Sequence, residues 1–217
     1  MKKSIIFGAS GFVGSYLLTE LLNNEDYDEV IAVVRKKLNI RHPKLKILIG
    51  DYHSLTDLKA QLIADDVFIT LGSTKKKTPK LEEYYQIDHD YPVLAASLSQ
   101  QNGATSVFLL TAIGANPKSN VFYVRTKGEV ERGITALNFD HTHIFRPSVI
   151  MGNRKEKRLV EKIMIKICAV INPLFVGKTN KYRGITAQNI AKSMNNAAKN
   201  QTDKVRIYHW KEMNALL

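Results

Sequence analysis

Short apolar runs of strand length alternate along the chain with longer amphipathic segments. The strand-length runs lie at 4–7, 30–34, 46–49, 67–71, 106–110, 143–145 and 205–208. The helical patterns lie at 12–22, 81–99, 121–137, 157–171 and 187–199. Nearly continuous apolar strands joined by helices are typical of a parallel sheet covered on both faces, and right-handed crossovers favour a doubly wound arrangement. We therefore expect an α/β fold with a doubly wound parallel sheet and a small C-terminal helical appendage.

Length and composition predict one domain. The 217 residues, 44% of them apolar, are enough for one packed core, so we expect a single domain over 1–217. Within it, we expect residues from about 148 to 200 to form a small cap on the substrate side. The amphipathic segment 159–175 covers a cleft, belongs to the core or forms an oligomer contact. We expect no signal peptide and no membrane span, and the lone Cys168 fits a reducing compartment. The sequence thus predicts a soluble, cytoplasmic protein.

The formal charge of +12 raises the question of a nucleic-acid partner. The basic residues gather at 35–37, 75–77 and 154–158, in three separate places without aromatic residues between them. A nucleic-acid surface would place such clusters on one face and interleave aromatic side chains. The pattern therefore favours a solvated basic surface, partly serving an anionic cofactor, over nucleic acid. His141 and His143 lack a third ligand nearby, so we expect no metal site.

Three evenly spaced glycines follow the first apolar run, in the stretch SIIFGASGFVGSYL. A strand that turns sharply into a helix exposes the first helical N–H groups and the positive end of the helix dipole. We expect Gly8 to make the turn, Gly11 to let a diphosphate approach, and Gly14 to let the helix pack on the sheet. Ser10 adds a hydroxyl donor, and Phe12 begins the helix beside the phosphates. The alternative is a glycine turn that binds nothing.

Basic residues end the second predicted strand, in the stretch EVIAVVRKKLN. An acidic residue at this point would bind a ribose 2′-hydroxyl, whereas a basic one accommodates a 2′-phosphate. Arg35 and Lys36 therefore favour NADP(H), with NAD(H) as the other candidate cofactor. An ordinary basic loop is the alternative.

The ends of later strands complete the expected cofactor site. Asp51 and Tyr52 follow the third strand, where the carboxylate is placed to hold the adenine amino group. The turn at Leu71–Gly72 ends the fourth strand and can lie against the ribose. Pro147 and Val149 follow the sixth strand, where a rigid turn flanks the nicotinamide.

A candidate catalytic set follows the fifth strand. Tyr123 and Lys127 are four residues apart in a helical pattern, so they share one face. A lysine cation near a phenol favours the phenolate, which suits the tyrosine to exchange a proton with a carbonyl or alcohol oxygen. We expect Tyr123 and Lys127 to contact the cofactor as well, with the lysine at the nicotinamide ribose. Thr111 ends the strand, with a hydroxyl that can donate to the same oxygen. For the first two residues, the alternative is a surface tyrosine packed on a lysine side chain.

The stretches GASGFVG, YVRTK and RPSVIMG, in this order, resemble the short-chain dehydrogenase/reductase superfamily. More narrowly, FITLGST, YYQIDHDYPVLAA, LLTAIGAN and FYVRTKGEVE are similar to its atypical, Tat-interacting-protein-like branch. The resemblance implies a Rossmann fold that binds NADPH at the glycine turn and Arg35, with Tyr123, Lys127 and Thr111 as the catalytic set. Two departures stand out, because relatives often have serine in place of Thr111 and asparagine in place of Asp88.

These observations together predict an NADPH-dependent oxidoreductase that transfers hydride to a small, apolar carbonyl compound. The alternative is a non-catalytic NADP(H)-binding regulator or scaffold with a protein partner. A sugar-nucleotide epimerase or dehydratase fits less well, since the chain after Pro147 is short for a sugar-nucleotide domain. We expect a monomer or a homodimer.

Overall fold

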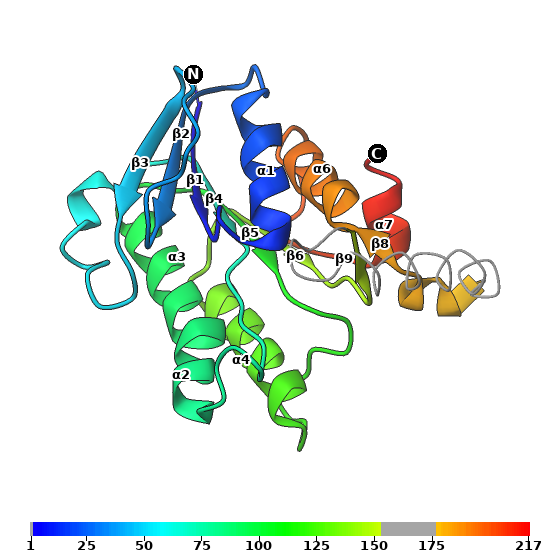
Figure 1. Ribbon diagram of the computed structural model, residues 1–217. Helices are drawn as coiled ribbons and strands as arrows, with labels where there is room; N and C mark the ends of the chain where they lie inside the picture. The colour runs from blue at the N-terminus through cyan, green and yellow to red at the C-terminus, as the bar shows by residue number, and fades with distance from the viewer. Residues whose placement is uncertain (1, 153–176) are drawn as a thin grey trace.

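The computed structural model describes residues 2–152 and 177–217 (Figure 1). Among these residues the main sheet has seven strands in the order β3-β2-β1-β4-β5-β6-β9, and every pairing is parallel. The strands are β1 Lys2–Phe7, β2 Tyr27–Val34, β3 Leu45–Ile49, β4 Asp66–Ile69, β5 Ser106–Leu110, β6 His141–Phe145 and β9 Val205–Tyr208. A small second sheet pairs β7 Ile150–Met151 with β8 Ile185–Thr186.

Helices cover both faces of the main sheet. They are α1 Phe12–Leu22, α2 Leu81–Tyr85, α3 Tyr91–Gln101, α4 Phe122–Ala136, α6 Ala187–Ala197 and α7 Trp210–Asn214. Figure 1 shows α1 and α6 side by side on one face, and α3 and α4 on the other. The predicted Rossmann-like doubly wound sheet, with a small C-terminal helix, is confirmed. The predicted single domain with a cap at 148–200 stays a prediction.

The apolar strands result from this two-sided covering. In β1, Ile6 packs with Leu17 of α1 and Ile190 of α6. Its neighbours Ile5 and Phe7 point to the opposite face and pack with Ala95 of α3 and other residues of that layer. Both faces of the strand are therefore buried, which explains why its sequence shows no alternation of apolar and polar residues.

The segment predicted as one helix at 81–99 is interrupted. A wider, π-helical turn at Gln86–Asp90 separates α2 from α3, and the N–H of Tyr91 bonds the carbonyl of Gln86, five residues earlier. Pro92 comes directly afterwards and has no N–H to donate to the carbonyl of Asp88, so one α-helical hydrogen bond is lost there. The wide turn places Asp88, 1% exposed, inside the protein.

Part of the predicted organisation lies outside the described residues. This applies to the helix expected at 157–171, the basic cluster at 154–158, the segment 159–175 and Cys168. Within residues 2–152 and 177–217, no helix is long and apolar enough to cross a membrane. The same residues contain no cluster of three or more histidine, cysteine or acidic side chains suited to a metal ion.

His143 of β6 predicts an acid-sensitive stability. Its ring stacks on the ring of Phe108, with 4.7 Å between the ring centroids, and its Nδ1 lies 2.8 Å from the hydroxyl oxygen of Tyr208. Burial, with a smaller contribution from His141, lowers the pKa of His143 to about 4. The unfolded chain, with a histidine pKa of about 6.5, therefore binds the proton first as the pH falls. The difference between the two pKa values contributes to the free energy of unfolding, and this contribution is fully present above about pH 6.5. It is lost as the pH falls toward 4, and about 2 kcal/mol of it is gone at pH 5.

Urea unfolding at pH 7 and pH 5 measures this effect. The His143→Phe variant keeps a ring in the stack but has no group that titrates there. Between pH 7 and pH 5 we expect it to lose about 2 kcal/mol less of its free energy of unfolding than the wild type loses. Equal losses in both proteins would rule out His143 as the cause.

Candidate active site

The first glycine turn is shaped so that no side chain fits at two of its positions. Gly8 has φ 95°, and a Cβ there would lie 2.7 Å from Thr70 Oγ1. A Cβ on Gly14 would lie 2.0 Å from the carbonyl oxygen of Gly8. The chain can therefore turn from β1 into α1 beside Thr70 only with glycine at both positions, and α1 starts pressed against the turn.

Gly11 leaves open the space in front of the helix. Among the described residues, and apart from its chain neighbours, a Cβ there would meet only the carbonyl oxygen of Gly8, at 3.1 Å. Gly11 is the N-cap of α1 and no side chain caps the helix there. Gly11, Phe12 and Val13 line a cavity. A helix start with the positive end of its dipole toward a cavity fits a dinucleotide diphosphate.

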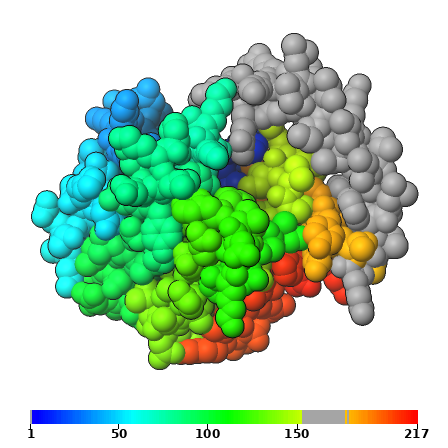
Figure 2. Space-filling model, turned by 90° about the horizontal axis from the view of Figure 1, so that it is seen from below, coloured from blue at the N-terminus to red at the C-terminus, as the bar shows by residue number. Residues whose placement is uncertain are grey.

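This cavity has a volume of about 690 Å³ and extends from the start of α1 to the start of α4. Figure 2 shows the hollow, with blue atoms of the N-terminal segment at its floor. Six of the predicted cofactor residues line it: Gly11, Phe12, Leu71, Gly72, Tyr123 and Lys127. The three predicted catalytic residues, Thr111, Tyr123 and Lys127, line it as well.

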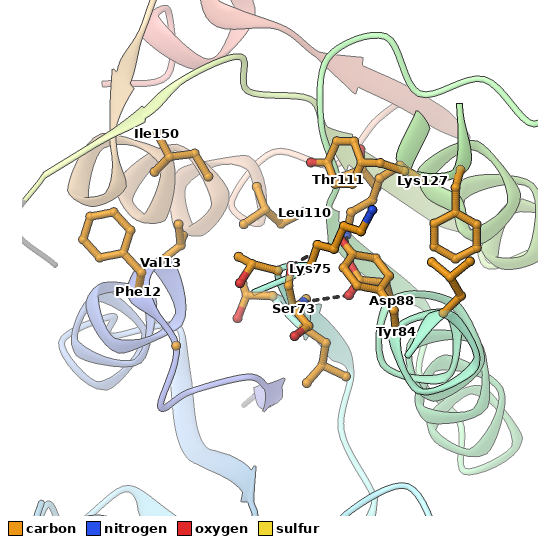
Figure 3. Close-up of a pocket in the computed structure, with 18 of the residues that line it drawn as sticks. Phe12, Val13, Ser73, Lys75, Tyr84, Asp88, Leu110, Thr111, Lys127 and Ile150 are labelled. Atoms are coloured by element: carbon orange, nitrogen blue, oxygen red, sulfur yellow. Dashed lines mark hydrogen bonds and ion pairs between the residues drawn. The ribbon is translucent and has the colours of Figure 1, made fainter. Parts of the chain in front are cut away.

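A buried ion pair lies at the end of the cavity that is lined by the predicted catalytic residues. Lys127 Nζ is 2.7 Å from Asp88 Oδ1, and the two side chains are 8% and 1% exposed. Asp88 Oδ2 accepts the N–H of Ser73 at 2.7 Å. A Cβ on Gly72 would lie 3.4 Å from Asp88 Oδ1, so glycine lets the loop after β4 approach the pair. The pair thus ties this loop, the wide turn and α4 together (Figure 3).

Two tyrosines line this end of the cavity, in different environments. Tyr123, on the first turn of α4, is 43% exposed. Tyr84, from α2, is 5% exposed, and its hydroxyl donates to the carbonyl of Ser73 at 3.3 Å. Burial, followed by the charges of Asp88 and Tyr123, raises the pKa of Tyr84 well above its usual value. Tyr84 is therefore a neutral phenol, and Tyr123 is the phenol that solvent can reach.

Thr111 follows β5, and its hydroxyl is already hydrogen-bonded within the protein. Thr111 Oγ1 donates to Glu131 Oε1 at 2.6 Å and lies 3.3 Å from the carbonyl oxygen of Phe145. Glu131 in turn accepts Nε of Arg146 at 2.9 Å. The sequence-based expectation assigned this hydroxyl proton to a substrate oxygen, whereas the structure directs it to a carboxylate. Glu131 itself was missed, although it lies four residues after Lys127 and hence on the same helical face.

The residues expected around the adenine end gather outside this cavity, around Tyr91. Tyr52 packs edge-on against the Tyr91 ring, with 6.1 Å between the ring centroids. Burial, as the main cause, raises the pKa of Tyr91 to about 12; the charge of Asp51 raises it further and that of Arg35 opposes the rise. The charges of Arg35 and Asp51 thus both affect the pKa of the Tyr91 hydroxyl, although the two residues follow different strands, β2 and β3.

Asp51 also closes its own loop. Its Oδ1 accepts the backbone N–H groups of His53 and Ser54, at 3.0 and 3.2 Å. The backbone hydrogen bond from Ser54 is the main reason that the pKa of Asp51 is lowered.

The remaining predicted residues lie on loops at the carboxyl ends of strands. Ser10 is exposed in the glycine turn, and Lys36 is exposed after β2. Pro147, after β6, is buried and its carbonyl accepts the N–H of Ile113, whereas Val149 is 41% exposed. All of these loops lie at the edge of the sheet where ligands of open α/β folds bind.

Apolar side chains form a wall that the sequence did not reveal. Phe12, Val13 and Ile150 lie on one side of the cavity, opposite Tyr84 and Lys127 (Figure 3). Of these three, only Phe12 was predicted, and that was for its place next to the phosphates. In the sequence the other two are ordinary apolar residues, with nothing to distinguish a cavity wall from the core.

A model of the NAD(P)H-binding family matches residues 8–201. The chain belongs to this family. Among the relatives of this NAD(P)H-binding protein is HTATIP2 of Rattus norvegicus, 32% identical over 161 residues, which cover 72% of this chain and 66% of that protein. The resemblance to the atypical, Tat-interacting-protein-like branch of the short-chain dehydrogenases/reductases is thereby confirmed.

Fungal relatives are equally similar to this NAD(P)H-binding protein. FMP52 of Candida glabrata is 33% identical over 153 residues, 70% of this chain and 66% of that protein, so the match spans just under two thirds of the relative's length. The fmp52 protein of Emericella nidulans is 31% identical over 75% of this chain and 73% of its own length. Both are named mitochondrial proteins. The expected cytoplasmic location is therefore wrong, and no residue of the cofactor or catalytic set bears on location.

Solved structures support the same fold. MoeE5 in complex with UDP-glucose and NAD has a TM-score of 0.71 at 17% identity, over 99% of this chain and 80% of that one. WbmH of Bordetella bronchiseptica in complex with NAD+ has a TM-score of 0.70 at 18% identity, over 97% of this chain and 76% of that one. At these identities the likeness concerns the fold of the NAD(P)H-binding protein alone.

Proposed function

We propose that the protein is an NADPH-dependent reductase of small, apolar carbonyl compounds. The observation that carries this proposal is that one cavity is lined both by the glycine turn and by Tyr123 with Lys127. A cofactor whose diphosphate lies at the helix start would extend along the cavity toward the phenol. The reacting groups would then meet in a space bordered by Phe12, Val13 and Ile150.

The residues that would hold the cofactor follow from this placement. Gly11 and Phe12, which line the cavity at the start of α1, would face the diphosphate, and Leu71 and Gly72 would lie beside it. Arg35, exposed after β2, supplies paired donors for a 2′-phosphate, which favours NADP(H) over NAD(H). When bound, the reduced nicotinamide supplies the hydride for the carbonyl carbon.

Proton transfer falls to the chain's own side chains. Tyr123 donates its phenolic proton to the carbonyl oxygen as the new C–H bond forms, which yields the alcohol and a phenolate. The Lys127 cation, held in place by Asp88, stabilises that phenolate until solvent returns the proton to the exposed ring. Thr111 is the third polar group of this set.

The test is NADPH oxidation with a panel of aldehydes, ketones and enones. We expect cofactor consumption that depends on one or more of these compounds. NADPH binding is first established by thermal unfolding, because a ligand of the folded state raises the Tm. Stabilisation by NADPH without any consumption across the panel would contradict the proposal.

One observation favours a second candidate function, a non-catalytic NADP(H)-binding regulator. The Asp88 carboxylate compensates the charge of Lys127, which weakens the help that this cation gives to a phenolate. Such a protein would be stabilised by NADP(H) and would not turn it over. Its binding to a protein partner would change with the cofactor.

Replacement of Arg35 by alanine is expected to weaken NADPH binding by about tenfold or more, since charge-assisted hydrogen bonds contribute about 1.5–3 kcal/mol. NADH has no 2′-phosphate and should bind to within about twofold of the wild type. Calorimetric titration with both cofactors measures the two changes. Lys37→Ala, two residues further in the same exposed run, serves as the charge-matched control. Equal losses for NADH and NADPH would contradict the role of Arg35.

A further inference from the structure

Three polar side chains from separate elements meet at the edge of the cavity, where Thr111 is a lining residue. Thr111 follows β5, Glu131 lies on α4 and Arg146 follows β6. Glu131 Oε1 accepts both Thr111 Oγ1, at 2.6 Å, and Arg146 Nε, at 2.9 Å, and Glu131 Oε2 contacts Arg146 Nη2. The Glu131 side chain is only 7% exposed. The guanidinium thus pairs with the carboxylate by two parallel contacts.

The position of the Thr111 proton follows from these contacts. A carboxylate paired with a guanidinium can only accept, and a separation of 2.6 Å is usual for a hydroxyl that donates to a carboxylate. Among the described residues, the other hydrogen-bond partner of this hydroxyl is the carbonyl oxygen of Phe145, which also only accepts and already takes the N–H of Thr111 at 2.8 Å. A hydroxyl has a single proton, so both neighbours draw it away from the cavity.

We propose that Thr111 offers the cavity a hydrogen-bond acceptor and no donor, and that Glu131 is the positioning residue that fixes this orientation. The inference deepens the proposed function, because it concerns the third member of the same catalytic set. A carbonyl oxygen beside Thr111 would meet lone pairs, whereas an alcohol hydroxyl or an N–H group would donate to them. Tyr123 is then the donor for a carbonyl oxygen, and the threonine selects for the alcohol.

The first experiment observes the proton directly in the full chain without ligand. In protein labelled with ¹³C and ¹⁵N on threonine, NMR should detect a slowly exchanging hydroxyl proton on Thr111. The signal should vanish in Thr111→Val and shift in Glu131→Gln. A corresponding signal should appear in the hydroxyl-retaining Thr111→Ser variant labelled on serine. Absence of a slowly exchanging hydroxyl signal specific to Thr111 would overturn the proposal, since a proton held by a buried carboxylate is protected from solvent.

The second experiment measures which ligand the cavity prefers, with cyclohexanol and cyclohexanone as a shape-matched pair. Their dissociation constants are compared on protein saturated with NADP+, by ligand-observed NMR. We expect the alcohol to bind about fivefold more tightly to the wild type, the value of one hydrogen bond of about 1 kcal/mol. This preference should disappear in Thr111→Val and persist in Thr111→Ser.

Glu131→Gln adds a third readout. The glutamine amide can donate to Thr111 Oγ1 and so release the hydroxyl proton toward the cavity, which should lower the preference for the alcohol. Tighter binding of the ketone by the wild type, or an unchanged ratio in Thr111→Val, would overturn the proposal. Neither experiment requires turnover, so a failure of the proposed reductase activity would be seen separately, as absence of NADPH oxidation.

Discussion

Replacement of Tyr123 by phenylalanine should lower kcat for carbonyl reduction by about 10²- to 10⁴-fold, the usual contribution of a positioned general acid. The ring and its packing remain, and only the proton donor is lost. We therefore expect the dissociation constant for NADPH to stay within about twofold of the wild-type value. Stopped-flow or steady-state NADPH oxidation, together with calorimetric titration, separates the two quantities.

Tyr84→Phe is the matched control, because Tyr84 lines the same cavity. Its hydroxyl donates to the carbonyl of Ser73, and its pKa is raised by burial, so it holds its proton. We expect this variant to lose less than about tenfold in kcat, the effect of a supporting hydrogen bond of about 1 kcal/mol. A Tyr123→Phe variant as active as the wild type would exclude Tyr123 as the acid.

The second large effect concerns the stability provided by Lys127 and Asp88. Either Asp88→Asn or Lys127→Met leaves one buried charge without its partner, which is expected to destabilise the fold by about 3 kcal/mol. The double variant removes both charges and should lose much less than the sum of the two. Urea unfolding of the wild type, the two single variants and the double variant gives the coupling energy.

Lys80→Ala and Glu83→Ala form the control cycle, because this pair lies on the surface with side chains 79% and 56% exposed. Its coupling should stay below about 0.5 kcal/mol, as for other exposed pairs. Additive losses at Lys127 and Asp88 would show that the two side chains do not stabilise each other.

Local patterns were enough to predict the architecture. The strand at 106–110 and the helix at 12–22 have the observed bounds, because each is a buried run bordered by clear turn residues. The glycine spacing identified the turn at Gly8, Gly11 and Gly14, where only glycine fits at two of the three positions. The four-residue spacing of Tyr123 and Lys127 likewise placed both side chains in one cavity.

Contacts between distant residues could not be predicted in this way. Asp88 was noted as a departure from the family pattern, but its pairing with Lys127 depends on how α4 packs beside the wide turn. The Thr111 hydroxyl donates its hydrogen bond to Glu131, whose carboxylate is paired with Arg146 after β6. Neither pair has a sequence spacing that identifies it. The location in the names of the fungal relatives, mitochondrial, could not be predicted either, because no residue of the predicted cofactor or catalytic set bears on location.

The wide turn at Gln86–Asp90 has a consequence for sequence comparison. A π-helical turn holds one residue more than the α-helical turn that it replaces, so a relative with an unbroken helix here would be one residue shorter between Tyr84 and Tyr91. An ungapped alignment would then rotate one half of the helix by about 100° relative to the other and place a neighbour of Asp88 opposite the lysine. A single-residue gap at this point therefore marks a homologue without the wide turn, and the residue opposite its lysine is found only when that gap is placed.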